Sequence, residues 1–249
     1  MTPSARRRAV STINRGLERF SVQLVRAGHD WSDTTSFIPF EETRSAAEAS
    51  GLSIGDYVEK QSGTSQKTID FMTGLGVFDR ALEGVVEVGP GTGRYLEKML
   101  SHCVAGTYEI YETAGPWRDY LKQRFSVNSK EVDGYTLAGT RSRSVDLAHA
   151  HKVFCSVPFM VTCSYWSEFC RVVRGGGWAV FDIMSEHCLE NDRTQAWVDS
   201  QIHNGSFPAV MPFEVTRDYF ERRGFQLVGS ILIDMPPGST EVLAFRKSA

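Results

Sequence analysis

The chain has 249 residues, of which 41% are hydrophobic, and its formal net charge is −3. This length and composition suit one large globular domain, or one domain with an extension. The negative net charge argues against a nucleic-acid partner, and no apolar run approaches the roughly 18 residues that a membrane span needs.

The N-terminus and the cysteines give no sign of export or of a structural metal. The arginine-rich start of the chain has no apolar segment after it, so we expect no secretory signal. The five cysteines form no CxxC pair and show no metal-like spacing with histidine. We therefore expect reduced thiols in a cytoplasmic protein, without a metal site made from cysteines.

Residues 1–80 carry helical signals and no convincing buried strand. A first amphipathic helix is indicated by apolar residues at helical spacing, namely Ala9, Ile13, Leu17, Phe20 and Leu24. A loop and short helices follow, and "TSQKTIDFMTGLGVF" indicates a further helix that ends near Gly74 or Gly76. The pattern predicts a helical N-terminal extension, residues 1–80, before a second domain, residues 81–249.

Short apolar runs then alternate with helical patterns. The expected strands are 84–89, 106–112, 127–132, 144–151 and 177–183, and the expected helices are 91–102, 115–125 and 159–173. Such alternation indicates βαβ units and a parallel sheet. Two final runs, 225–235 and 240–248, flank a Pro-Pro-Gly turn and must therefore pair antiparallel. The predicted fold is an α/β, Rossmann-like open sheet of seven strands, parallel except for an antiparallel C-terminal hairpin.

A glycine-rich loop follows the first strand, in the stretch "VVEVGPGTG". Ligands of open parallel sheets bind at the carboxyl ends of strands, where this loop lies. Its GxGxG spacing differs from the dinucleotide pattern GxGxxG, because Arg94 occupies the last glycine position, and no Gly-Lys-Ser/Thr follows as in a P-loop. The carboxylate of Glu87, inside the strand end, would repel a pyrophosphate and attract an ammonium group.

An acid also ends the second expected strand. Glu112 stands 23 residues after Gly89, and an acid at this place can accept hydrogen bonds from both ribose hydroxyls. The two strand ends together suit a ligand with an amino group, a ribose and little phosphate. S-adenosylmethionine has these features.

Three stretches resemble a known family. "VVEVGPGTG" is similar to motif I of class I S-adenosylmethionine-dependent methyltransferases, and "GTYEIYETAG" is similar to their second strand. "EFCRVVRGGGWAVFDI" resembles their helix, turn and fifth strand, although Gly175 stands where proline is common. The resemblance covers about residues 84–246 and implies S-adenosylmethionine as the cofactor.

The resemblance also implies a set of cofactor-binding residues: Glu87, Gly89, Pro90, Gly91, Gly93, Glu112 and Asp133. Asp133 stands in "EVDGYTL", at the expected end of the third strand, where the family often places an acid near the adenine amino group. A turn residue before Gly134 is the alternative interpretation of Asp133.

The fourth expected strand ends in "AHAHKVF", which offers a general base. His149 and His151 are two residues apart and should point to the same face. A hydroxyl acceptor needs a base, and an imidazole with a pKa near 6.5 suits that role. We expect His151 as the base, with His149 second and His187 weaker. Asp182 lies near a position that could hold a metal ion, but no second acid ends the fourth strand, so we expect no metal site.

The residues quoted so far do not identify the methyl acceptor. The stretches around the fourth and fifth strands resemble bacterial sugar and natural-product O-methyltransferases, which implies a hydroxyl of a small-molecule or saccharide acceptor. N- or C-methylation of a small metabolite, and a non-catalytic binding protein with the same fold, are the alternatives. Residues 1–80 are expected to cover the substrate, and their first helix offers a surface for a homodimer.

Overall fold

The computed structural model describes residues 38–63, 65–190, 192–201 and 207–249. These residues belong to one compact unit that runs from Ser32 to Ala249. The predicted amphipathic helix at residues 9–24 lies outside the described residues.

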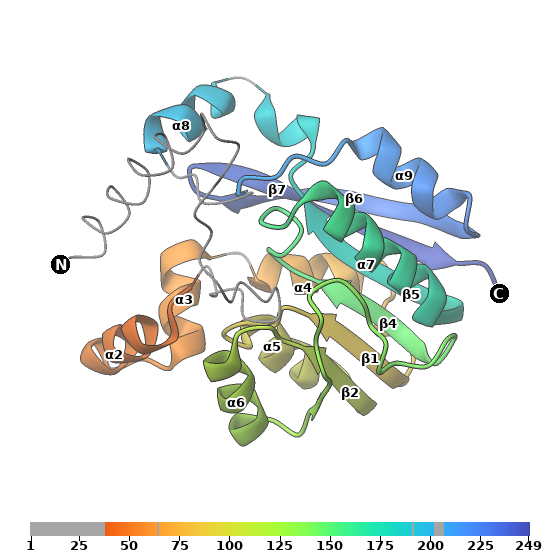
Figure 1. The fold of residues 1–249 in the computed structure, drawn as a ribbon, viewed down its shortest axis with the longest axis horizontal. Coiled ribbons are helices and arrows are strands. Elements are labelled where there is room, and N and C mark those ends of the chain that lie inside the picture. Colours follow the sequence, from red (N-terminus) through yellow and green to blue (C-terminus); the bar gives the residue numbers. More distant parts are fainter. Residues whose placement is uncertain (1–37, 64, 191, 202–206) are drawn as a thin grey trace, which may run out of the picture. The chain divides into compact units, whose positions relative to one another are not determined.

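Seven strands form one mixed sheet in the order β3-β2-β1-β4-β5-β7-β6 (Figure 1). They are β1 Leu82–Val88, β2 Ala105–Tyr111, β3 Asn128–Ser129, β4 Val145–Ala150, β5 Val173–Ile183, β6 Phe225–Met235 and β7 Gly238–Lys247. Strands β1 to β5 pair in parallel. Strand β7 runs antiparallel to both β5 and β6. The predicted α/β sheet with its antiparallel C-terminal hairpin is therefore confirmed.

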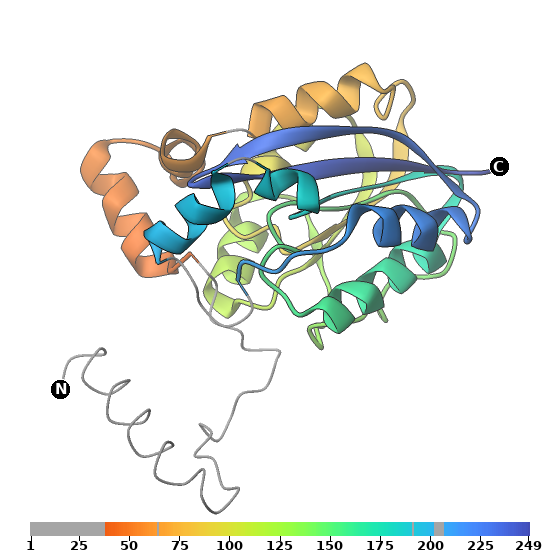
Figure 2. The same cartoon turned by 90° about the horizontal axis from the view of Figure 1, so that it is seen from above.

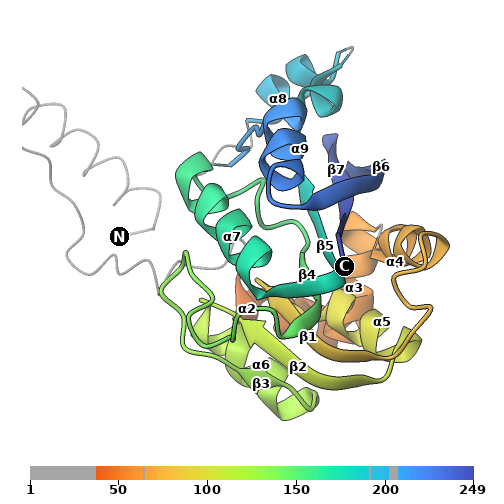
Figure 3. The same cartoon turned by 90° about the vertical axis from the view of Figure 1, so that its right-hand side faces the viewer.

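Helices cover both faces of this sheet. They are α2 Phe40–Ser50, α3 Ile54–Ser62, α4 Ser65–Gly74, α5 Arg94–His102, α6 Gly115–Arg124, α7 Phe159–Val172, α8 Arg193–Ser200, α9 Phe213–Glu221 and the short 3-10 helix η3 Glu186–Leu189. Helices α7 and α9 lie on one face and α4 and α5 on the other, as Figures 2 and 3 both show. No helix among the described residues has the length and apolar character that crossing a membrane requires.

Burial explains the composition of the strands. All six residues of the central strand β4 are buried, and four of them are apolar, as is typical of a strand covered on both faces; the other two are Asp146 and His149. The edge strand β6 instead alternates between more and less exposed positions, because one of its faces is only partly covered. Apolar runs and alternating runs in the sequence therefore reflect the position of a strand in the sheet.

Two apolar cores lie on the two faces of the sheet. Trp166 and Phe220 belong to the core on the side of α7 and α9. Ile69 and Met72 of α4 belong to the core on the side of α5. A helix that we expected in the N-terminal extension thus shares a core with the sheet. All five cysteines are free thiols.

Two strands differ from their predicted bounds. Strand β3 is only Asn128–Ser129, where the sequence predicted 127–132. Strand β5 begins at Val173 and includes the glycine run that was expected to form a turn before it. Val145 pairs with Val173 and Leu147 with Trp178, so β5 bulges across these glycines. Gly176 has a φ of 73°, which a glycine adopts without strain.

Candidate functional site

The glycine loop connects β1 to α5 at the carboxyl end of the sheet. Gly89, Gly91 and Gly93 have φ angles of 63°, 51° and 76°. Residues with a Cβ atom rarely adopt this left-handed region. The buried Pro90 lies between them, and its carbonyl accepts a hydrogen bond from Gly93 N–H at 2.9 Å. The backbone itself therefore requires the GxGxG pattern.

The three glycines differ in what surrounds them. A Cβ atom on Gly93 would lie 2.6 Å from Leu121 Cδ2, and one on Gly89 would lie 2.7 Å from Val153 Cγ2. At Gly91 the nearest atom in that direction is 4.0 Å away. Gly89 and Gly93 are therefore packed by the protein, whereas Gly91 leaves room for a ligand to approach the backbone.

Glu112 lies against this loop, directly after β2. Its Oε2 accepts a hydrogen bond from Gly91 N–H at 2.8 Å, and its Oε1 accepts one from Ala114 N–H at 2.8 Å. Burial raises the pKa of Glu112, and the two backbone donors oppose that rise. The side chain is 5% exposed. An acid that is buried yet bound to the loop backbone is placed to meet a ligand seated on Gly91.

Glu87 forms a buried polar network with two other side chains. Tyr108 donates a hydrogen bond to Glu87 Oε2 at 2.7 Å, and the Tyr108 hydroxyl lies 2.9 Å from His149 Nε2. The phenol has one proton, so when it donates to Glu87 the second hydrogen bond comes from a hydrogen on His149 Nε2. Burial raises the pKa of Glu87 to about 8, opposed by the hydrogen bond from Tyr108. A cationic group beside Glu87 would favour its ionised form.

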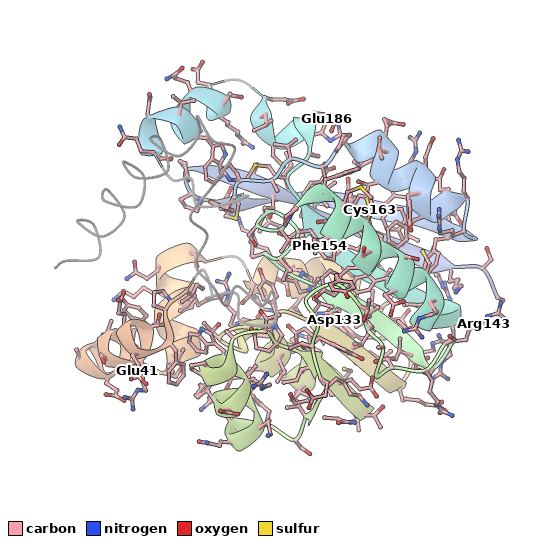
Figure 4. All side chains as sticks on the ribbon, viewed as in Figure 1. Glu41, Asp133, Arg143, Phe154, Cys163 and Glu186 are labelled. Carbon is pink, nitrogen blue, oxygen red and sulfur yellow. The ribbon has the colours of Figure 1, made fainter. Side chains whose placement is uncertain are left out.

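Asp133 lies on the loop after β3 and is labelled in Figure 4. Its Oδ1 accepts hydrogen bonds from Tyr135 N–H at 3.0 Å and Thr136 N–H at 2.7 Å. Because β3 ends at Ser129, Asp133 does not follow the strand directly as the sequence predicted. Its carboxylate closes a turn of its own loop, and the adenine contact stays a prediction.

The two histidines of β4 do point to the same side, with ring centroids 5.2 Å apart. His149 is fully buried and, as described above, bound to Tyr108. His151, the first residue after β4, stacks on Tyr95 of α5 at 4.4 Å. Neither ring nitrogen of His151 has a hydrogen-bond partner within the part of the chain that the structure describes.

Burial changes the acid–base character of both imidazoles. It lowers the pKa of His151 to about 3, helped by the nearby charges of Lys152 and Arg94. It also lowers the pKa of His149 well below the ordinary value. The sequence led us to expect imidazole pKa values near 6.5. That expectation was wrong because both side chains are buried, which disfavours the protonated ring. Both rings are neutral at neutral pH, the form that can accept a proton.

Sequence reasoning missed the role of Arg94, which it treated only as a missing glycine. Its guanidinium donates to the Gly63 carbonyl at 3.1 Å and to Ser62 Oγ at 3.2 Å, and it pairs with Glu59 Oε2 at 3.4 Å. The arginine therefore ties the end of α3 to the start of α5. The sequence does show a charged residue, Arg94, directly after a loop of small residues, and this charge could have indicated a polar contact there.

One hollow of the described residues lies away from these side chains. A hollow of about 320 Å³ is lined by Glu83, Arg174 and residues 141–144. These residues lie at the amino ends of β1, β4 and β5, away from the glycine loop. Since open parallel sheets bind ligands at the carboxyl ends of their strands, we place the site at the loop.

Comparison with known proteins agrees with this geometry. Residues 86–181 match the family model described as a methyltransferase domain. The matched region begins in β1, includes the glycine loop, Glu112 and both histidines, and ends in β5. No curated protein sequence is significantly similar to the chain.

Solved structures share the fold at low sequence identity. One is a Galdieria sulphuraria protein assigned as a sarcosine dimethylglycine methyltransferase, with 10% identity, a TM-score of 0.59, and coverage of 84% of this chain and 98% of that one. An O-methyltransferase family protein from Burkholderia thailandensis has 16% identity and a TM-score of 0.58, covering 84% and 63%. Magnesium protoporphyrin IX methyltransferase from Synechocystis, solved with S-adenosylmethionine bound, has 10% identity and a TM-score of 0.55, covering 74% and 79%.

The family match, the seven-stranded sheet and the glycine loop lead to one assignment. Gly91 leaves a ligand-sized approach to the loop backbone, and Glu112 stands beside it as a ribose-binding acid would. The chain therefore carries a methyltransferase domain over residues 86–181, with S-adenosylmethionine as its cofactor.

Proposed function

We propose that the protein transfers a methyl group from S-adenosylmethionine to a hydroxyl of a small-molecule or saccharide acceptor, with His151 as the general base. One observation carries this proposal. The neutral imidazole of His151 follows β4 directly, and neither of its nitrogens has a partner among the described residues. A buried polar group without a partner is unusual in a folded protein and calls for an explanation such as a ligand.

The chemistry explains why a base is needed. When bound, S-adenosylmethionine supplies an electrophilic methyl group on a good leaving group, so the protein mainly has to align the acceptor. A hydroxyl is a poor nucleophile until its proton is removed. Burial keeps the ring of His151 unprotonated at neutral pH, and Asp182 Oδ1, 4.0 Å from its Nδ1, would stabilise the imidazolium that forms when the ring takes the proton. An amine acceptor, once unprotonated, needs no such base.

The remaining residues are proposed to bind the cofactor or support the base. Glu87 would face the ammonium group of S-adenosylmethionine, and the backbone of the glycine loop would contact its methionine part. Glu112 would bind the ribose hydroxyls, and Asp133 would bind the adenine amino group. His149 is a second candidate base, but its hydrogen bond to Tyr108 favours a role in holding the buried network.

We also propose that the helices before β1 cover the substrate. The contacts of Arg94 with Glu59, Ser62 and Gly63 support this role, because they join the end of α3 to the start of the cofactor-binding helix α5. The described helices of the predicted extension would then act together with the domain at residues 81–249 rather than apart from it.

The variant His151→Ala tests the base directly. With a hydroxyl acceptor, we expect the rate of methyl transfer to fall by about 10²–10⁴, while the affinity for S-adenosylhomocysteine stays within about twofold. His102→Ala, on the exposed side of α5, is the matched control and should keep full activity. An unchanged rate of transfer to that hydroxyl in His151→Ala would refute His151 as the base.

A further inference from the structure

A second set of polar side chains lies beside His151, at the carboxyl ends of β4 and β5. Lys152 Nζ donates to Thr240 Oγ1 at 2.6 Å and lies 3.8 Å from Asp182 Oδ2. His151 Nδ1 lies 4.0 Å from Asp182 Oδ1. Strands β4, β5 and β7 are neighbours in the sheet, and this order brings the four residues together.

The hydrogen bonds of this cluster are incomplete. Among the described residues, Asp182 Oδ2 and both ring nitrogens of His151 are buried and accept or donate no hydrogen bond. The ammonium group of Lys152 has three hydrogens, and within the described part of the chain it donates one hydrogen bond, to Thr240. Leaving buried polar atoms such as those of Asp182 and His151 without a hydrogen bond destabilises a folded protein. The cluster is therefore built to receive polar atoms from outside the chain.

The backbone at Lys152 is held in an unusual conformation. Its φ is 60°, in the left-handed region that residues with side chains rarely adopt. The Lys152 N–H donates to Asp182 Oδ1 at 2.6 Å, which holds this conformation in place. Strained residues of this kind gather at ligand-binding and active sites. Asp182 thus uses one oxygen to shape the turn after β4, while the other, which lies 3.8 Å from Lys152 Nζ, has no hydrogen-bond partner among the described residues.

We propose that Lys152 and Asp182 bind a second hydroxyl of the acceptor, next to the one that is methylated, so that the substrate class is a vicinal diol. That hydroxyl would donate to Asp182 Oδ2 and accept from Lys152 Nζ. The neighbouring hydroxyl would give its proton to His151. This inference rests on the proposed function, because it places the methylated hydroxyl at His151.

A hydroxyl suits the pair better than a charged group. An anion would be repelled by Asp182, and a cation would be repelled by Lys152, because the two opposite charges lie within 3.8 Å of each other. An apolar group would leave the buried oxygen of Asp182 unpaired. Only a group that both donates and accepts, as a hydroxyl does, satisfies the two side chains together.

Lys152 provides the approach to this subsite. Its side chain is 16% exposed, whereas those of His151 and Asp182 are 1% exposed. Burial lowers the pKa of Lys152, opposed by the charge of Asp182. A diol that enters along Lys152 would reach the subsite of its second hydroxyl first and would then place the first hydroxyl at His151.

Equilibrium binding to the S-adenosylhomocysteine complex tests this inference without requiring turnover. Two matched pairs of probes are used: catechol with phenol, and methyl α-mannopyranoside with its 2-deoxy analogue. In the wild type we expect at least one diol to bind about 10- to 100-fold more tightly than its mono-hydroxyl partner, as for hydrogen bonds to charged groups. Asp182→Asn and Lys152→Met should each remove that preference.

An exposed ion pair elsewhere supplies the matched controls. Lys67 and Asp234 pair at 3.3 Å on the surface, so Lys67→Met and Asp234→Asn make the same chemical changes away from the site. Both controls should keep the preference for the diol. The ratio within each pair of probes does not depend on the folded fraction, so a partly unfolded variant still gives an answer.

Three results would overturn the inference. One is equal affinity of the wild type for both members of each pair. Another is a preference that survives in Asp182→Asn and Lys152→Met. The third is a loss of S-adenosylhomocysteine affinity in these variants with an unchanged diol preference, which would assign the cluster to the cofactor. Failure of methyl transfer to every hydroxyl, with diol binding intact, would instead refute the proposed function alone.

Discussion

Replacing Gly91 or Gly93 by alanine should separate two reasons for a glycine in the same loop. Both residues have a left-handed φ, 51° and 76° respectively, and alanine in this conformation costs about 1–2 kcal/mol. At Gly93 the new methyl group would also lie 2.6 Å from Leu121 Cδ2 and 3.0 Å from Phe125 Cε2. Overpacking of this kind adds about 1–3 kcal/mol.

The expected free energies of unfolding follow from these contacts. Gly91→Ala should lose about 1–2 kcal/mol, because its methyl group meets no atom closer than 4.0 Å. Gly93→Ala should lose about 2–5 kcal/mol from both effects. Urea unfolding of the protein without ligand measures this difference.

The affinity for the cofactor should show the opposite order, with Gly91→Ala more affected than Gly93→Ala. In Gly91→Ala the methyl group fills the space left for a ligand, so we expect the dissociation constant for S-adenosylhomocysteine to rise more than tenfold, although this variant is the more stable one. Calorimetric titration measures the affinity. Wild-type affinity in Gly91→Ala would refute the assignment of the open face of Gly91 to the cofactor.

Four further predictions concern other parts of the chain. Burial raises the pKa of Glu87 from 4.5 to about 8, so the wild type should lose stability relative to Glu87→Gln as pH rises between these values, measured by urea unfolding at several pH values. Glu112→Ala leaves the N–H groups that it binds unpaired and should lower both stability, by about 1–3 kcal/mol for each buried donor, and cofactor affinity. Trp166→Ala should cost about 3–5 kcal/mol in the same unfolding assay, since the indole is fully buried. The hydrogen bond to Glu241 raises the pKa of His187, so Glu241→Gln should bring that pKa, followed by NMR, down toward its ordinary value; an unchanged titration would contradict the pairing.

Much of the fold could be predicted because it depends on local patterns. Alternating apolar runs and helical patterns identify the βαβ units, and the short turn between the last two runs forces them to pair antiparallel. Strand β3 and the glycine run of β5 were placed less well. A strand of two residues, Asn128–Ser129, leaves little periodicity to read, and the bulge of β5 depends on its register with β4.

The candidate site likewise has features that the sequence predicts and features that depend on the tertiary structure. The glycine loop was visible because a positive φ restricts the residue type at each position, and Glu112 was visible because it ends a strand. The acid–base state of His149 and His151 was not visible. Their pKa values depend on burial beneath α5 and on neighbouring charges, and residue type alone reports neither.

By itself, the sequence determined the order of the elements, the conformation of the glycine-rich loop and the class of reaction, because these depend on residue types within short segments. Only the tertiary structure decided which polar groups meet. Lys152, Asp182 and Thr240 are far apart along the chain, and they come together because β4, β5 and β7 are adjacent in the sheet. The buried Oδ2 of Asp182, which has no hydrogen-bond partner among the described residues, results from that adjacency and from the burial that accompanies it. Neither can be read from any one segment.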